Sequence, residues 1–243
     1  MLAFPVALAE VRRAGEGATM SSQQQCATSD CNTRLRTMTK LVCAAIMATT
    51  IVAQAQTFTV LHTSTGGSDG AQPPSGLTMD SAGNLYGVAI SGAMGYGDVY
   101  KMTHSAGGWG MSPLYRFRGG YDGAYPVAPP VFGPDGALYG TTSGGGGGCS
   151  SYGCGTVYRL APQPSACKAA PCEWTETVLY RAAADHGEEL EGQVLFDQAR
   201  NIYSTVALSG EHGGGYVFEL TPYGSGWTSQ VLYSFNPLQG DCG

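Results

Sequence analysis

Short apolar runs separated by polar turns fill the chain from residue 56 onward, and they predict β-strands. The apolar run 194–196 is followed by a polar turn at 197–201 and then by a β-rich run at 202–206, which is typical of a hairpin. Two further runs, 215–220 and 227–233, alternate apolar with polar positions. No segment after residue 56 repeats its apolar residues every 3.6 positions. The pattern therefore predicts an all-β fold of short antiparallel strands.

The same four runs recur along the chain, so the sequence predicts a stack of similar units. A Leu-Tyr pair marks each recurrence: Leu114-Tyr115, Leu179-Tyr180 and Leu232-Tyr233, with Leu61-His62 as an altered fourth copy. These pairs are offset by 53, 65 and 53 residues. A residue found in every unit is usually there to build the unit. The repeat therefore predicts the architecture of the protein but does not indicate a catalysed reaction.

The predicted units span residues 63–115, 116–180 and 181–233, and residues 234–243 begin a fourth. Four antiparallel strands in about 53 residues predict a β-propeller blade, with an open solenoid as the alternative. Residues 56–62 align with the fourth strand of a unit, but three units are fewer than the 4 to 8 blades of ordinary propellers. We therefore expect a partial β-propeller at 56–243, an incomplete ring that is a fragment or self-associates through its open blade edges.

One turn position predicts local strain. Gly83 and Gly136 occupy the same place in the first hairpin of the first two units, as expected where a turn needs a positive φ angle. Arg200 occupies that place in the third unit. We expect the third turn to be strained or altered.

Several motifs together carry a resemblance to a known family. They are Asn84-Leu85-Tyr86-Gly87, Leu138-Tyr139-Gly140-Thr141-Thr142, the Gly-x-Val-Tyr strands and the Trp-Thr-Glu-Thr-Val-Leu-Tyr strand that starts at Trp174. This combination is similar to the GloVer-type tandem repeat and covers residues 56–243. The resemblance implies a bacterial secreted or surface protein that is propeller-like, has no assigned activity and often carries a C-terminal anchor. The chain differs from the family pattern in its few repeats and in showing no such anchor.

The N-terminal region has the layout of an export signal. Residues 38–55 combine a cationic start, an apolar run at 41–52 and the small-residue site Ala53-Gln54-Ala55. The apolar run is shorter than the roughly 20 residues of a membrane span. We therefore predict a signal peptide cleaved after Ala55, with a buried N-terminal helix as the alternative. We expect residues 1–37 to be an upstream extension or a disordered segment, with an unusually long n-region of the signal as the alternative.

Composition supports an extracellular protein and argues against some partners. From residue 56 the chain has seven Lys and Arg residues against fifteen Asp and Glu residues, a net charge of −8. Nucleic acid and anionic membranes need clustered Lys and Arg, so neither is an expected partner. Glycine is 37 of 243 residues, about twice the usual ~7%, which suits tight turns between strands. No apolar segment after residue 56 is long enough to span a membrane.

The cysteines predict stapled loops. The second unit is 12 residues longer than its neighbours, and the extra residues carry two Cys-x4-Cys pairs, Cys149/Cys154 and Cys167/Cys172. In a secreted protein such insertions favour the disulfides Cys149–Cys154 and Cys167–Cys172, with Cys242 unpaired within the chain. Crossed pairs are one alternative. A zinc site is the other, although four-thiolate sites usually use a closer Cys-x2-Cys spacing.

Acidic residues offer the candidate chemistry. The Asp-Gly pairs at Asp69 and Asp122 are turn dipeptides, and a repeated Ca²⁺ site is the alternative interpretation. A patch found only in the third unit contains Asp185, His186, Glu188, Glu189 and Glu191. It could bind a cation or supply a general base, but a solvated loop explains it more simply. The sequence predicts no metal and no cofactor.

The functional hypothesis is therefore a secreted, non-enzymatic binding scaffold for an extracellular polysaccharide or protein. A lyase or hydrolase on a propeller is the first alternative, and it would need His186 or His212 beside the acids of the third unit. A carbohydrate-binding module is the second alternative. Its aromatic contacts would be the loop tyrosines Tyr96, Tyr121, Tyr125, Tyr152 and Tyr223.

Overall fold

Alternating apolar residues and frequent turns give a chain made almost entirely of β-strands. The computed structural model describes residues 57–148, 153–162, 174–182 and 188–239. This part contains strands β1 to β13 and the 3-10 helix η1 (Pro237–Gln239). It has no α-helix, and no helix in it is long and apolar enough to span a membrane. The all-β prediction is confirmed.

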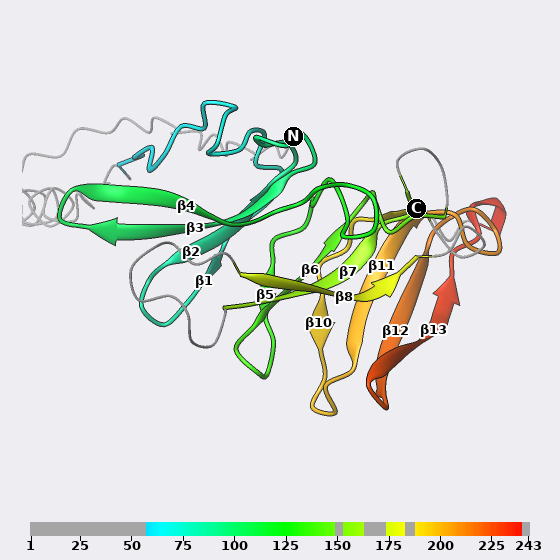
Figure 1. Cartoon of the computed structure of the whole chain (residues 1–243). Helices are drawn as coiled ribbons and strands as arrows, with labels where there is room; N and C mark the ends of the chain where they lie inside the picture. The colour runs from blue at the N-terminus through cyan, green and yellow to red at the C-terminus, as the bar shows by residue number, and fades with distance from the viewer. Residues whose placement is uncertain (1–56, 149–152, 163–173, 183–187, 240–243) are drawn as a thin grey trace, which may run out of the picture. The chain divides into compact units, whose positions relative to one another are not determined.

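The strands form three antiparallel sheets, one after another along the chain (Figure 1). The first sheet contains β1 (Thr78–Met79), β2 (Leu85–Ala89), β3 (Asp98–Ser105) and β4 (Gly108–Arg116). The second contains β5 (Val131–Phe132), β6 (Leu138–Thr142), β7 (Thr156–Ala161) and β8 (Thr175–Arg181). The third contains β10 (Leu195–Phe196), β11 (Ile202–Leu208), β12 (Tyr216–Tyr223) and β13 (Gly226–Ser234). In each sheet these four strands are paired in chain order, as the sequence predicts.

The third sheet has one more strand, β9 (Glu188–Leu190), which the sequence analysis missed. It pairs with the end of β11, where Glu188 faces Leu208 and Leu190 faces Val206. Leu190 is fully buried, so burial of its side chain holds the strand in place. The solvated-loop interpretation of the acidic patch is therefore wrong for residues 188–190. The first two units have only isolated bridges at the same place, Ala71↔Ser91 and Ala124↔Gly144.

A carboxylate holds the first hairpin of each unit. Asp80 accepts hydrogen bonds from the backbone N–H groups of Ala82 and Asn84, from the Asn84 side chain and from the Tyr86 hydroxyl. Asp197 holds the third hairpin through Asn201 and Tyr203. In both units the tyrosine of the second strand thus donates a hydrogen bond to the aspartate of the turn before it.

The second and third units each modify this turn. In the second unit Asp135 accepts a hydrogen bond from the Tyr139 hydroxyl and forms an ion pair with Arg159 at 2.6 Å. In the third unit Arg200 has a φ of 71°, close to the 81° of Gly83 and the 75° of Gly136. The prediction of strain at Arg200 is confirmed, because a side chain disfavours this left-handed conformation.

A β-bulge explains why Leu-Tyr marks every unit. In the first unit Val99 pairs with Tyr115 and Tyr100 pairs with Pro113, so Leu114 has no partner across the strand pair. Leu179 and Leu232 are skipped in the same way. An extra residue bends the strand and re-aims its side chains. The repeated Leu-Tyr pair is therefore a bulge built into the outer strand of each unit.

The core lies between successive sheets. Tyr86, Val88 and Val99 of the first unit are buried against a second set of side chains: Leu138, Tyr158 and Leu160 of the second unit. Another cluster joins Tyr139 and Val157 of the second unit to Val194, Ile202 and Phe218 of the third. The second sheet therefore buries one face against the first sheet and the other against the third, and this packing fixes the loops at the sheet ends.

Candidate functional site

Three loops of the first two units meet at one end of the sheets. They are the β2–β3 loop (90–97), the first part of the β4–β5 connection (117–125) and the first part of the β6–β7 loop (143–148). The Tyr125 N–H donates to the Tyr96 carbonyl at 2.8 Å, and the Gly146 N–H donates to the Gly120 carbonyl at 2.6 Å. We call these residues the loop surface. Backbone hydrogen bonds give it a defined shape.

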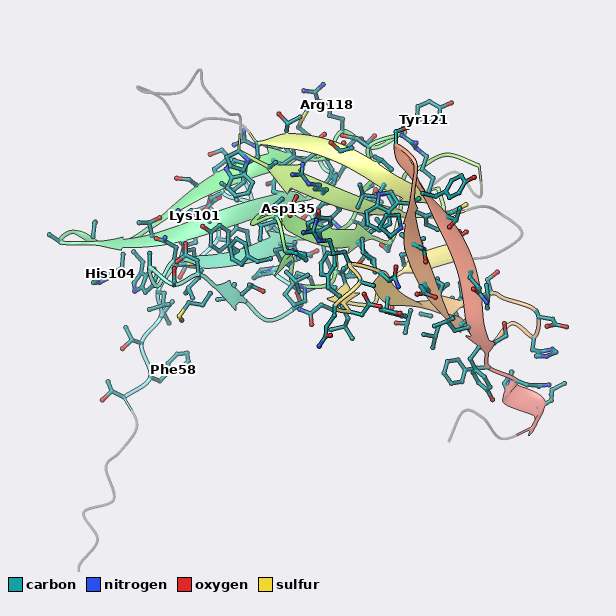
Figure 2. The ribbon with its side chains drawn as sticks, turned by 90° about the horizontal axis from the view of Figure 1, so that it is seen from below. Phe58, Lys101, His104, Arg118, Tyr121 and Asp135 are labelled. Atoms are coloured by element: carbon teal, nitrogen blue, oxygen red, sulfur yellow. The ribbon has the colours of Figure 1, made fainter. Side chains whose placement is uncertain are left out.

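The loop surface carries three of the predicted tyrosines. Tyr121 is 76% exposed, and its side chain projects away from the ribbon in Figure 2. The half-buried ring of Tyr125 lies 6.2 Å from the ring of Tyr96, centre to centre. Tyr125 has a φ of 57°, a conformation that the surrounding hydrogen bonds maintain. Tyr223 ends β12 at the other end of its sheet, and Tyr152 lies outside the described residues.

Arg181 supports the most exposed of these rings. Its Nε donates to the Tyr121 carbonyl at 3.2 Å, and its guanidinium lies 5.9 Å from the centre of the Tyr121 ring. Arg116 makes the corresponding hydrogen bond to the Ser68 carbonyl in the first unit. The sequence analysis missed this role, although an arginine directly after Leu-Tyr in both units was a usable signal.

The Asp-Gly pairs build the loops that carry the tyrosines. Asp122 accepts hydrogen bonds from the Arg118 N–H and the Tyr115 hydroxyl, both at 3.0 Å. Gly123 follows with a φ of 106°, and a Cβ there would lie 2.7 Å from Thr142 Oγ1. Asp69 holds its own loop through both the N–H and the hydroxyl of Thr65. These contacts support the turn interpretation of both pairs.

The five-glycine run at 144–148 is closely packed in its first three residues. Gly144, Gly145 and Gly146 are buried, and the Gly145 carbonyl accepts hydrogen bonds from the N–H groups of Cys154 and Gly155. A Cβ on Gly145 would meet the backbone of Gly123. Glycine is required here because two backbones approach closely.

Cys154 is fully buried and disulfide-bonded. The other three cysteines of the proposed pairs, Cys149, Cys167 and Cys172, lie outside the described residues. The pairing Cys149–Cys154 and Cys167–Cys172 stays a prediction, and peptide mapping without reduction would test it. Each short bridge restricts the unfolded chain by only about 2 kcal/mol. We therefore expect loss of either bridge to loosen its own loop and to leave the sheets intact.

Only part of the acidic patch lies within the residues that the structure describes. Glu188 begins β9, while the Glu189 and Glu191 side chains are exposed. Asp185 and His186 lie outside the described residues. Within the described ranges, no group of three or more His, Cys, Asp or Glu side chains is placed to hold a metal ion.

A separate acidic pair lies beneath the loop surface. Burial and, to a lesser extent, the charge of Asp122 raise the pKa of Glu176 to about 7, although the charge of Arg181 opposes the shift. Buried oxygens of Glu176, Asp122 and Tyr158 have no hydrogen-bond partner. Because its oxygen is shielded from solvent, ionisation of Glu176 is expected to affect the stability of the fold.

Comparison with known families is consistent with the repeat architecture. The model of the Gloeobacter/Verrucomicrobia repeat matches residues 45–172, more than half of the chain. The chain belongs to the Gloeobacter/Verrucomicrobia repeat family. Among curated proteins, none matches it.

Membership in the Gloeobacter/Verrucomicrobia repeat family separates shared features from specific ones. The hairpin aspartates, the bulged Leu-Tyr pairs and the loop arginines recur between units, so they build the repeat. Tyr121 stands where the first unit has Ser68, and Glu176 stands where it has Met111. The glycine run and the cysteine pairs also occur in the second unit alone. Features that could distinguish this family member are therefore concentrated in and around the second unit.

Proposed function

We propose that this chain is an exported, non-enzymatic repeat scaffold whose loop surface binds a neutral extracellular polysaccharide. The observation that carries the proposal is the exposed Tyr121 ring, which Arg181 contacts and which shares the loop surface with the Tyr96 and Tyr125 pair. A tyrosine offers a flat apolar face and a polar hydroxyl at low cost in conformational entropy. The apolar C–H faces of sugar rings pack on such faces, and the sugar hydroxyls bond to polar groups around them.

Charge favours a neutral ligand over an acidic one. The net charge of −8 from residue 56 onward repels polyanions, including acidic polysaccharides. A protein partner would use the same exposed aromatic rings, so it is the second ligand class to test. The loop surface suits either class because its backbone is held by hydrogen bonds before a ligand arrives, which lowers the cost of binding.

In the same proposal, the three sheets are propeller-like blades related by one repeated rotation. Tyr86 meets Phe132 with ring centres 5.1 Å apart and planes at 84°, and Tyr139 meets Phe196 at 4.9 Å and 82°. Two nearly identical contacts support one operation that relates the first unit to the second and the second to the third. A repeated rotation about a common axis is the geometry of blades.

A pull-down on a panel of neutral polysaccharides tests the binding proposal. Tyr121→Ala should weaken retention at least about tenfold, equivalent to about 1.4 kcal/mol of binding free energy. Tyr223→Ala is the matched control, because Tyr223 is 74% exposed but lies at the other end of its sheet. Equal retention of the two variants, or no retention of the parent chain on any polysaccharide, would overturn the proposal.

Export is tested separately. The signal pattern at 38–55 and the presence of a disulfide at Cys154 support an oxidising destination. Protein recovered outside the cytoplasm should begin at Gln56 on N-terminal sequencing. Retention in the cytoplasm with residues 1–55 intact would contradict both the export and the cleavage after Ala55.

A further inference from the structure

The contact between successive units is built twice in the same way. Each time, a tyrosine of the second strand packs edge to face on a phenylalanine from the first strand of the following unit. We call the side of a unit that carries this tyrosine its forward face, and the side that carries the phenylalanine its rear face. Two of the three forward faces and two of the three rear faces are therefore joined within the chain.

No further unit packs on the forward face of the third unit within the described residues, and its apolar residues are open to solvent. Leu232 is 45% exposed, whereas its counterpart Leu114 in the first unit is 7% exposed. Tyr233 is exposed as well, and Val217 is half-buried where Val99 and Val157 are fully buried. The same side chains that form a core elsewhere are thus presented at this surface.

The rear face of the first unit is covered only in part, because Tyr100 and Met102 are buried whereas Leu77 is 46% exposed. Met79, which stands in the place of Phe132 and Phe196, is 64% exposed. Beside it a cavity of about 290 Å³ is lined by Leu77, Tyr100 and Met102 of this face. Leu61 and His62 line the other side of the cavity without filling it. They align with the Leu-Tyr pair of a preceding unit, so the cavity lies where that unit would pack.

We propose that two copies of the chain join head to tail, with the forward face of unit three packed on the rear face of unit one of the other copy. The exposed forward face and the partly covered rear face correspond to the two halves of an interface that the chain already forms twice, so a second copy supplies a complementary surface. Leu232-Tyr233 of one copy takes the place of Leu61-His62 of the other. Residues 61–64, which form no strand and leave the cavity unfilled, move aside.

Such an interface is heterologous, and it closes into a ring when the rotation between units allows. Two copies bring six units, which lies within the 4 to 8 blades of known propellers. Closure at two copies rests on the blade arrangement given under the proposed function. The head-to-tail contact itself rests only on the repeated interface.

Two charge substitutions and their mixture test the contact in the exported full chain. Leu232→Asp places a carboxylate on the forward face of unit three, and Met79→Asp places one on the rear face of unit one. Sedimentation velocity should show two copies for the parent chain and one copy for each variant. An equimolar mixture should form a 1:1 pair through the single unaltered interface. Tyr223→Asp is the control and should behave like the parent, because Tyr223 is exposed and lies at the opposite end of β12 from Tyr216 and Val217, which pair with Ser234 and Tyr233.

Restored pairing in the mixture also shows that both variants are folded. A parent chain that stays monomeric over about a hundredfold range of concentration would overturn the proposal. So would variants that still pair alone, or a mixture that stays monomeric. Growth beyond two copies would support the head-to-tail contact and would contradict the six-unit ring and the propeller arrangement with it.

Discussion

The ring of Tyr158 lies against Gly140, its partner across the β6–β7 strand pair, and leaves no room for a side chain there. A Cβ on Gly140 would lie 2.6 Å from the Cζ atom of the Tyr158 ring. Gly87 and Tyr100 repeat this relationship in the first unit. The third unit has Ser204 facing Phe218 instead. The position that faces the aromatic residue therefore carries a side chain, that of Ser204, only in the third unit, where phenylalanine replaces tyrosine.

This relationship predicts that Gly140→Ser destabilises the protein and that Tyr158→Phe restores part of the loss. The single change should lower the free energy of unfolding by about 1–3 kcal/mol, because an overpacked core forces its neighbours to shift. Tyr158→Phe alone should be nearly neutral, since it removes a buried hydroxyl that has no hydrogen-bond partner. Urea unfolding of the two single variants and the double variant measures the coupling. Additive effects of the two changes would show that the close approach does not limit residue 140.

The sequence predicted the features that depend on residues close together in the chain. The hairpin after Asp80 and the strain at Arg200 follow from turn chemistry within a few residues. The bulge at Leu114 was missed because it depends on which residue of β3 faces which residue of β4. A Leu-Tyr pair is equally compatible with a regular strand.

The candidate site was harder to predict because it depends on contacts between units. The sequence predicts Tyr96 and Tyr125 as separate loop aromatics, but the hydrogen bond between them forms only where the β2–β3 loop meets the β4–β5 connection. Arg181 is 60 residues from the Tyr121 carbonyl to which it donates. The need for glycine at position 145 likewise depends on a contact between residues distant in the chain, because its backbone closely approaches that of Gly123.

Strain at Arg200 predicts a stabilising substitution. Arg200→Gly should raise the free energy of unfolding by about 0.5–1 kcal/mol. Glycine adopts the positive φ angle without steric strain, and this gain outweighs its greater conformational freedom in the unfolded chain. Thermal or urea unfolding would measure the gain. Gly136→Arg is the mirror experiment, because nothing lies within 4 Å of a Cβ built at Gly136 and only the φ angle opposes the change. A stable Gly136→Arg variant would contradict the interpretation.

The hairpin carboxylate predicts a contribution to acid stability. The Asn84 side-chain amide, with help from the Asn84 N–H and the Tyr86 hydroxyl, lowers the pKa of Asp80 to about 2 from 3.8. A lowered carboxyl pKa gives stability that is present above pH 3.8 and is lost as the pH falls through about 2. Asp80→Asn should therefore be less stable than the parent at pH 7, and the difference should shrink toward pH 2. A difference that stays constant from pH 7 to about pH 2 would show that the charge of Asp80 has no role.

The buried carboxyl of Glu176 predicts the opposite dependence on pH. Its pKa is about 7 in the folded chain, mainly through burial, against 4.5 for the ordinary side chain. Between these values the folded state holds a proton that the unfolded state has released, so stability falls as the pH rises from 4.5 to 7. Glu176→Gln cannot ionise and should lose less stability than the parent over this range. Urea unfolding at several pH values gives the slope of the free energy of unfolding against pH for the parent and for Glu176→Gln. Glu191→Gln is the control at an exposed carboxylate. Equal slopes for the parent and Glu176→Gln would mean that Glu176 is ionised in the folded protein and that Arg181 outweighs its burial.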